Sequence, residues 1–339
     1  MLHTIKIENY KSVVSLELEL GRINVFIGEN GCGKTNILEG IALAAAAAGN
    51  KLDNEFLVAR GVRVTENELM RSAFERNENA INVAVIGEIK TLAYGIVNPS
   101  GLGWQSSQNM AGFFLGSEDL GIPTFLNYAP ENYFLRRFEE EGQIRPLGIR
   151  GEGLFKHLVD IYKTKPEILA KISEKLRLMG WFQGFEIPKD LMFSERRINI
   201  KDKYLQDLDF FDQRSANEGF LYLLFYFTLF MSEMTPPFFA IDNIDNALNP
   251  KLCQELIKQL AQLTQEHHKQ CIVSTHNPAI LDGLDLADDM QRLFTIYRNA
   301  EGHTIAKRIL PKKTPAGIEP VRLSEAYIRG YLGGLPKKI

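Results

Sequence analysis

The order of apolar and polar positions predicts strands and helices through the first hundred residues. Residues 3–10 (HTIKIENY) and 13–20 (VVSLELEL) alternate apolar and polar side chains, which is typical of half-buried strands. Residues 23–28 (INVFIG) are more continuously apolar and end in glycine, and the helix-forming run of residues 34–48 follows. Residues 81–99 hold two further strand-like runs, INVAVIGEI and TLAYGIVNP. This part of the chain therefore predicts an α/β lobe.

The pattern changes in the middle of the chain. Glycines interrupt residues 98–121, whereas residues 153–181 (GLFKHLVDIYKTKPEILAKISEKLRLMGW) contain helix-like segments. We therefore predict a mostly helical insert over residues 100–203.

The α/β pattern resumes after the insert. A strand at residues 237–242 (PFFAID), a helix at 250–268 and a strand at 270–276 (QCIVSTH) follow in the order expected of a parallel sheet. Residues 292–310 predict a late hairpin. The fold class expected is α/β, with a mixed sheet flanked by helices. The predicted lobe is discontinuous and comprises residues 1–99 and 204–310, with a C-terminal tail, 311–339, packed on it.

A phosphate-binding loop is the strongest motif in the sequence. Gly28–Thr35 (GENGCGKT) matches GxxxxGKT between an apolar strand and a helix, the context that identifies a P-loop. Its glycines let successive amides point at phosphate oxygens, and the positive end of the following helix adds attraction. Lys34 is expected to reach the β and γ phosphates and Thr35 to ligate Mg²⁺. The residues predicted here to bind ATP are Asn30, Gly31, Cys32, Gly33, Lys34, Thr35 and Asn36.

A second element of such a site is an aspartate at the end of a neighbouring strand, oriented toward Mg²⁺. Asp242 ends FFAID, so it is predicted to be a metal ligand together with Thr35. Asn243 stands next, where many ATP-hydrolysing proteins carry an acidic residue. An amide can orient water but cannot accept its proton, and losing a general base costs on the order of 10²- to 10⁴-fold in rate. Asp245 is an alternative base, and the sequence leaves that alternative open.

A third element lies at the end of the following strand, VSTHNP. His276 at this strand tip is predicted to hydrogen-bond the γ phosphate and to report its presence. The predicted catalytic residues are therefore Asp242, Asn243, Asp245 and His276.

Composition limits the classes of function. The formal net charge of −3 and the sequence pI near 6.1 give no global attraction to nucleic acid. Three widely spaced cysteines favour a reduced compartment, and the first residues lack the apolar core of a signal peptide. Residues 220–231 are apolar but number twelve, whereas a membrane span needs about twenty. We expect a buried helix there and a cytoplasmic protein without membrane contact.

Together these pieces resemble the ATP-binding-cassette class of ATPase heads, which includes RecF, SMC proteins and overcoming-lysogenization-defect nucleases. The likeness rests on IKIENYKSV, GENGCGKTNILEGI, FFAIDNIDNALNP and IVSTHNP. It implies that Lys11 and Ser12 lie under the nucleotide. It also implies that the turn RSANEGF, with Ser215, Asn217 and Gly219, caps the γ phosphate of a second subunit, although it departs from the family's LSGGQ.

The tail LSEAYIRGYLGGLPKKI is similar to the ending of stand-alone AAA family ATPases from bacterial phage-defence operons. Two functions follow from these resemblances. The first is a slow ATPase that forms a homodimer, or a higher oligomer built from dimers, around ATP and Mg²⁺ and switches a separate nuclease or toxin effector in anti-phage defence. The second is a RecF-like ATPase that binds DNA in repair. A transporter subunit is disfavoured by the missing LSGGQ, and kinase and nuclease chemistry lack supporting residues.

Overall fold

The chain forms two compact units. The computed structural model describes residues 1–74, 78–88, 90–98, 103–109, 121–138, 146–188, 195–205, 207–311 and 321–335. The first unit comprises Met1–Asn127, Pro236–Asp245 and Cys253–Ile339. The second comprises Tyr128–Thr235 and Asn246–Leu252. The sequence-based boundaries at residues 99, 203 and 310 stay predictions.

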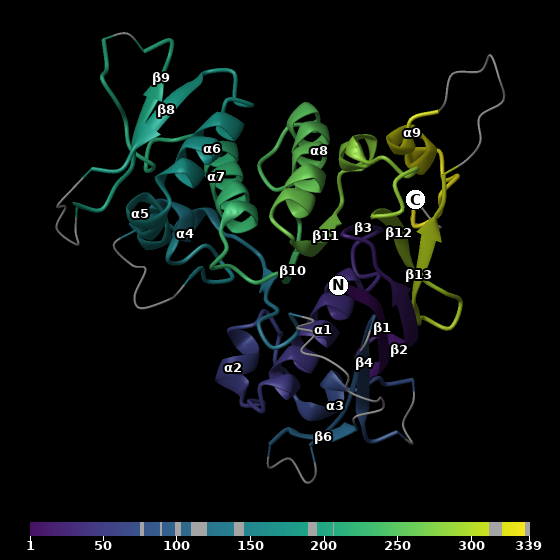
Figure 1. The fold of residues 1–339 in the computed structure, drawn as a ribbon. Coiled ribbons are helices and arrows are strands. Elements are labelled where there is room, and N and C mark those ends of the chain that lie inside the picture. The colour runs from purple at the N-terminus through teal and green to yellow at the C-terminus, as the bar shows by residue number, and fades with distance from the viewer. Residues whose placement is uncertain are drawn as a thin grey trace. The chain divides into compact units, whose positions relative to one another are not determined.

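An antiparallel sheet forms one layer of the first unit, with its described strands in the order β2-β1-β4-β5-β6 (Figure 1). These strands are β1 (Leu2–Tyr10), β2 (Val13–Glu19), β4 (Ile81–Gly87), β5 (Thr91–Val97) and β6 (Gln105–Asn109). Apolar positions meet across the sheet, because Ile5 lies opposite Leu18 on β2 and Val85 on β4. The predictions of β1, β2, β4 and β5 are confirmed. β6 was missed, because its polar sequence QSSQN has no apolar alternation and its pairing with β5 forms it.

A second, mixed sheet positions the P-loop, and its described strands have the order β13-β12-β3-β11-β10-β7. The strands are β3 (Ile23–Ile27), β7 (Asn127–Tyr128), β10 (Phe238–Ile241), β11 (Gln270–Thr275), β12 (Gln291–Arg298) and β13 (Thr304–Ile309). β3 pairs in parallel with β11 and β12, and β10 pairs in parallel with β11. The segments that follow β3, β10 and β11 therefore leave the same edge of the sheet. The predicted late hairpin is confirmed as β12–β13.

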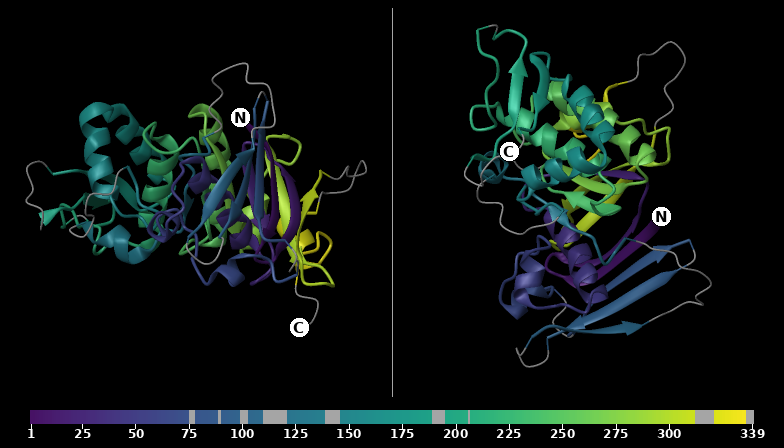
Figure 2. Two further views of the ribbon diagram at one scale, coloured as in Figure 1. Left: turned by 90° about the horizontal axis from the view of Figure 1, so that it is seen from below. Right: turned by 60° about the vertical axis from the view of Figure 1, so that its left-hand side comes forward.

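Helix α1 (Lys34–Ala48) contacts strands of both sheets: β1, β4 and β5 of the first and β11 of the second (Figure 2). Its small alanines, Ala42–Ala46, are fully buried in the core. Small side chains keep the helix close to its neighbours, and alanine also has the best helix propensity. The alanine run is thus a packing element that anchors the end of the P-loop.

The rest of the first unit includes short helices and one long one. Their bounds are α2 (Asn54–Val58), α3 (Asn67–Met70), α8 (Pro250–Glu266), the 3-10 helix η4 (Pro278–Gly283) and α9 (Leu323–Ile328). The first residues of α8 belong to the second unit. α8 buries Cys253, Leu256, Ile257, Leu260 and Leu263, the spacing of one helix face. This spacing confirms the predicted helix between β10 and β11.

The second unit is built around a buried helix. Its described elements are α4 (Asn132–Arg136), α5 (Leu154–Thr164), α6 (Pro166–Leu176), β8 (Phe182–Glu186), β9 (Asn199–Asp202) and α7 (Glu218–Met231). α7 is buried from Gly219 to Met231, which confirms the predicted buried helix. Across the described residues, no helix combines the length and apolar character that crossing a membrane requires. The β8–β9 hairpin was not predicted.

Candidate functional site

The loop between β3 and α1 has the backbone that its glycines require. Gly31 and Gly33 have φ angles of +74° and +107°, in the left-handed region that favours glycine. A Cβ on Gly28 would lie 2.1 Å from the carbonyl oxygen of Ile296 on β12, so this position admits no side chain. Gly33 is the N-cap of α1 and supplies no side-chain cap, so the first amides of the helix face the loop uncapped.

Lys34 folds back over this loop. Its Nζ donates to the carbonyl oxygens of Gly28 at 2.9 Å and Glu29 at 3.1 Å, and it lies 3.4 Å from Nδ1 of His276. Burial lowers the pKa of Lys34, an effect opposed by Cys32 and Asp242. The partners of the ammonium group are therefore neutral backbone carbonyls. The charged oxygens of an anionic ligand can replace them, because hydrogen bonds between charged groups are stronger.

Thr35 and Asp242 meet as predicted. The Thr35 hydroxyl donates to Oδ2 of Asp242 at 2.8 Å, and the Ser274 hydroxyl on β11 donates to Oδ1 of Asp242. Ser274 also accepts from the backbone N–H of Asn243 at 3.0 Å. A hydroxyl beside a carboxylate is a hard oxygen donor pair of the kind that Mg²⁺ takes together with phosphate oxygens and water. The residues therefore fit a magnesium ion, with Thr35 and Asp242 as its protein ligands.

The residues after Asp242 form a tight turn. Asn243 has a φ of +54°, a left-handed conformation in which asparagine and aspartate are enriched several-fold over other non-glycine residues. The Asp245 carboxylate accepts from the Thr275 hydroxyl at 2.7 Å and from the His276 N–H at 3.4 Å. Asp245 is thus tied to the end of β11, and the turn presents an amide at position 243.

His276 lies at the loop, as predicted from its place at the end of β11. Burial and the neighbouring Lys34 ammonium lower the pKa of His276, and Asp245 and Asp242 oppose the shift. The lowered pKa favours the neutral form of the imidazole. A neutral ring next to the Lys34 ammonium can donate a hydrogen bond to an anion or accept one from the ammonium.

The other face of the loop is held by side chains from four segments. Thr304 on β13 donates to the carbonyl of Cys32 at 2.9 Å and lies 2.7 Å from the Ser12 hydroxyl. Asn36 donates to Ser12 at 2.7 Å, and Arg298 donates to the carbonyl of Gly31 at 3.0 Å. Ser12 therefore adjoins the P-loop, and its predicted place under the nucleotide stays a prediction.

Lys11 lies in a charge cluster that surrounds the buried carboxylate of Glu39 beside this face. Glu39 on α1 is fully buried, and its carboxylate accepts from Lys11 at 2.7 Å and from Nε of Arg63 at 2.5 Å. Burial is the main cause that lowers the pKa of Lys11, whereas the hydrogen bond to Glu39 raises the pKa of Arg63. Tyr10 also donates to Glu39, at 3.3 Å. The cluster fixes Lys11 and Arg63 beside Asn36.

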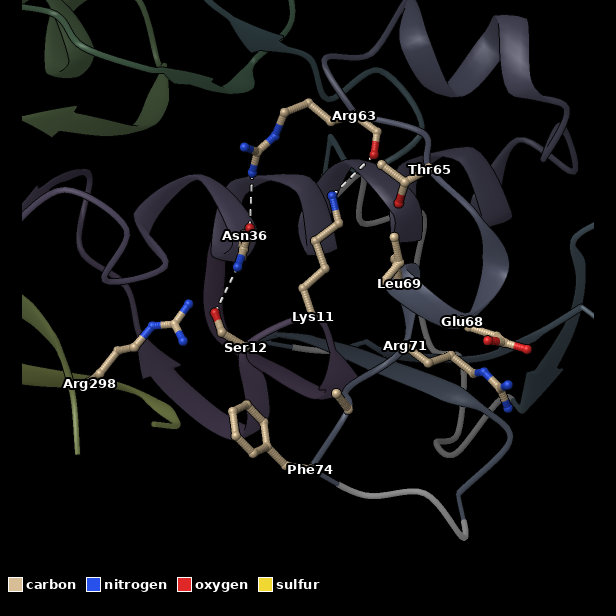
Figure 3. Close-up of a pocket in the computed structure, with 11 residues that line it drawn as sticks. Lys11, Ser12, Asn36, Arg63, Thr65, Glu68, Leu69, Arg71, Phe74 and Arg298 are labelled. Atoms are coloured by element: carbon tan, nitrogen blue, oxygen red, sulfur yellow. Dashed lines mark hydrogen bonds between the residues drawn. The ribbon is translucent and has the colours of Figure 1, made fainter. Parts of the chain in front are cut away.

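A cavity of about 460 Å³ opens over these residues. Figure 3 shows the chain of hydrogen bonds from Arg63 to Asn36 to Ser12 along it, with Arg298 near Ser12. Leu69 and Phe74 give the cavity an apolar wall, while cationic groups contribute to its lining. A pocket with one aromatic wall and several hydrogen-bonding groups suits a nucleoside next to a phosphate loop.

The signature-like turn lies in the second unit. Asn217 is the N-cap of α7, and Ser215 and Asn217 are exposed. A Cβ on Gly219 would lie 3.0 Å from the carbonyl oxygen of Ala247, so glycine is the residue that packs there without displacement. The turn therefore presents polar groups at the start of a long buried helix, while its placement relative to the P-loop stays a prediction.

The structure brings most predicted residues to one place. Lys34, Thr35, Asp242, Asp245 and His276 converge through the contacts above, and Asn243 follows Asp242 directly. Asn30 and Gly31 are exposed at the loop's tip, and Cys32 is buried beneath it. The residues that sequence reasoning missed are Ser274, Thr304, Glu39, Arg63 and Arg298. Ser274 had a signal, because it lies in the polar end of VSTH; the others come from segments whose approach depends on tertiary folding.

Two family models match the chain. Residues 1–85 match the model described as "AAA ATPase domain". Residues 129–282 match the model described as "AAA domain, putative AbiEii toxin, Type IV TA system". Each model covers less than half of the chain.

Curated relatives match over short segments. A DNA replication and repair protein RecF from Rickettsia typhi is 51% identical over 43 residues, which are 12% of this chain and 12% of that protein. The RecF of Listeria welshimeri is 40% identical over 55 residues, 16% of this chain and 15% of the relative. The matched segments thus span about an eighth to a seventh of the relatives' length.

Solved structures match over nearly the whole chain. An SMC head bound to the C-terminal winged-helix domain of ScpA has a TM-score of 0.60 and 17% identity, covering 91% of this chain and 98% of that one. The SMC head from Thermotoga maritima has a TM-score of 0.51 and 16% identity, covering 91% and 99%. At such identities the likeness shows the fold alone, which is the P-loop fold of the ABC class, as predicted. The two domain models, the RecF segments and the SMC-head fold are all similar to parts of ABC-type AAA ATPases.

Proposed function

We propose that the chain binds Mg-ATP between Gly28 and Asn36 and hydrolyses it slowly, so that bound ATP acts as a switch. The observation that carries this proposal is the convergence of Lys34, the Thr35–Asp242 pair and His276 at one sheet edge. Lys34 and the uncapped amides of α1 would bind the phosphates. Mg²⁺, held by Thr35 and Asp242, would neutralise charge on the phosphates.

The cavity over Ser12 supports adenosine as the rest of the ligand. Phe74 offers a face for a base, and Arg298 and Asn36 offer hydrogen-bond donors within the same cavity. Titration calorimetry with ATP and magnesium tests binding directly. Binding by the wild type that is lost in Lys34→Ala supports the proposal; absence of wild-type binding would refute it.

The turn after Asp242 supports the proposal of slow hydrolysis. Asn243 cannot accept a proton, and hydrogen bonds from Thr275 and His276 hold the Asp245 carboxylate at the end of β11. The expected turnover is well below that of a motor ATPase. Long-lived bound ATP in turn favours a switch over a motor.

We propose further that two copies close around ATP, each offering its turn at Ser215–Gly219 to the other's γ phosphate. The polar N-terminus of α7 supports this, because it presents amides and helix-dipole charge suited to an anion. Light scattering should report a dimer with Mg-ATP and a monomer without nucleotide. Ser215→Glu should block dimerisation and leave ATP affinity of the monomer intact. Gln262→Glu, which adds the same charge at an exposed position of α8, should change neither dimerisation nor ATP affinity. Equal dimerisation of both variants would contradict the trans contact.

We propose that the switch acts on a separate effector protein in anti-phage defence. The support for this proposal is the family description of residues 129–282, which names a toxin and a type IV toxin–antitoxin system. Expression of the native locus in a phage-sensitive bacterium should reduce plaque formation, and Lys34→Ala in the same locus should restore it. Equal plaque numbers on bacteria that carry the wild-type locus and the Lys34→Ala locus would contradict a role in anti-phage defence.

A RecF-like DNA-binding ATPase is the second candidate, favoured by the RecF segments and by the cationic side chains around the cavity. DNA retention in gel shifts that requires ATP and falls steeply as salt rises would favour it. If DNA is not retained even at low salt, the effector switch is the function that stays supported.

A further inference from the structure

The C-terminal residues 321–335, here called the clip, pack beside the nucleotide loop in the first unit. One end is fixed at η4, the helix that follows His276. Ser324 on α9 donates its N–H to Oδ1 of Asp282 at 2.9 Å and its hydroxyl to Oδ2 at 2.6 Å. The clip is therefore tied to the segment that leaves β11.

The other end of the clip contacts the P-loop itself. The N–H of Glu29 donates to the carbonyl of Gly334 at 3.2 Å, and the Tyr327 hydroxyl donates to the same oxygen at 3.1 Å. The carbonyl of Glu29 accepts from Lys34. Glu29 thus carries contacts to the clip on one side of its backbone and to the phosphate-binding lysine on the other.

The clip is shaped for this contact. Gly333 and Gly334 have φ angles of +79° and +81°, and a Cβ on Gly334 would lie 3.3 Å from Cβ of Thr295. Tyr327 is 5% exposed, and burial raises its pKa to about 12, so the hydroxyl keeps its proton near neutral pH. Thr295 on β12 also donates to the carbonyl of Leu332 at 3.3 Å. A buried tyrosine and two left-handed glycines aim one carbonyl at Glu29.

We propose that Tyr327 and Gly334 are positioning residues that hold the Glu29 peptide, and with it the entrance of the P-loop, in the conformation that receives ATP. The role rests on the proposed ATP binding. A loop fixed before binding loses less conformational freedom when it closes on phosphates, so the clip raises affinity without touching the ligand.

Hydrogen exchange on the nucleotide-free chain, residues 1–339, tests the contact without ATP. Gly334→Ala strains the backbone and crowds Thr295, so amide exchange at Glu29 should rise roughly fivefold, the equivalent of one lost hydrogen bond. Gly333→Ala is the matched control, because its φ is nearly the same while a Cβ there has no atom within 4 Å. Tyr327→Phe should give a smaller rise and Tyr331→Phe, at an exposed position, none.

Nucleotide affinity tests the role. Gly334→Ala and Tyr327→Phe should weaken ATP binding by about threefold to tenfold, with turnover at saturating ATP within about twofold of wild type. Unchanged exchange in Gly334→Ala, or changes equal to those of Gly333→Ala, would overturn the contact. Faster exchange with unchanged ATP affinity would overturn the positioning role. If wild type binds no ATP, the proposed function fails and the positioning role falls with it, while the exchange result still decides the contact.

Discussion

The two halves of the candidate site differ in how their polar groups are placed. On the phosphate side, Lys34, Thr35 and Asp242 have the residue types and contacts that a magnesium-bound phosphate chain requires. On the side where the attacking water is expected, Asn243 supplies an amide, and the Asp245 carboxylate already accepts a hydrogen bond from Thr275 at the end of β11. The groups expected to bind phosphate and Mg²⁺ are present, whereas position 243 offers no general base. We therefore expect that ATP binding and ATP hydrolysis can be changed separately in this chain.

Removing the Lys34 side chain should have the largest effect on ATP affinity. Lys34→Ala deletes a charge-assisted partner of the phosphates, and ATP affinity should fall roughly 100-fold. Calorimetry measures the loss, with exposed Lys258→Ala on α8 as control. If affinity in Lys34→Ala stays within about threefold of wild type, the phosphates bind elsewhere.

Ser274→Ala should weaken the binding of Mg-ATP, because Ser274 holds the Asp242 carboxylate. The substitution removes the hydroxyl that donates to Asp242 and accepts from the Asn243 N–H. Leaving buried polar groups without a partner costs about 1–3 kcal/mol in the free energy of unfolding. Urea unfolding should show this loss without magnesium, and ATP should bind less tightly with magnesium. A stability equal to wild type would show that Asp242 is held by other contacts.

His276 connects the halves and should give a moderate pH effect. Burial and Lys34 lower its pKa in the free protein, and a bound γ phosphate would raise it by adding negative charge. A group whose pKa rises on binding takes up a proton, so ATP affinity should increase as pH falls toward and below about 6.5. The increase expected between pH values of about 8 and 5.5 is roughly threefold to fivefold beyond that of His276→Asn. The variant controls for protonation of ATP, and identical pH profiles would remove the sensor role.

Asp245→Asn should have the smallest effect on turnover. Its carboxylate is engaged by Thr275 and the His276 N–H, and an amide oxygen can accept the same bonds. Phosphate release at saturating ATP should stay within about twofold of wild type. A fall of roughly 100-fold or more would instead assign Asp245 as the general base.

The elements that carry local patterns were predictable from the sequence. Alternation found β1 and β2, the glycine motif placed the P-loop before α1, and two apolar strands led to Asp242 and His276. β6 was not predictable, because a polar strand forms through its partner and not through its own propensity. The groups behind the loop, such as Glu39 and Thr304, were missed for a similar reason: they come together through long-range packing, which spacing along the chain does not encode.

We propose that this site holds ATP longer than it would with an acidic residue at position 243. Phosphate release at saturating ATP, compared between wild type and Asn243→Asp, tests it most directly. Aspartate matches asparagine in size and in tolerance of the left-handed φ of +54° at this position. We expect the variant to turn over at least about tenfold faster, with ATP affinity within about twofold of wild type. Rapid turnover by wild type that the substitution does not increase would contradict it.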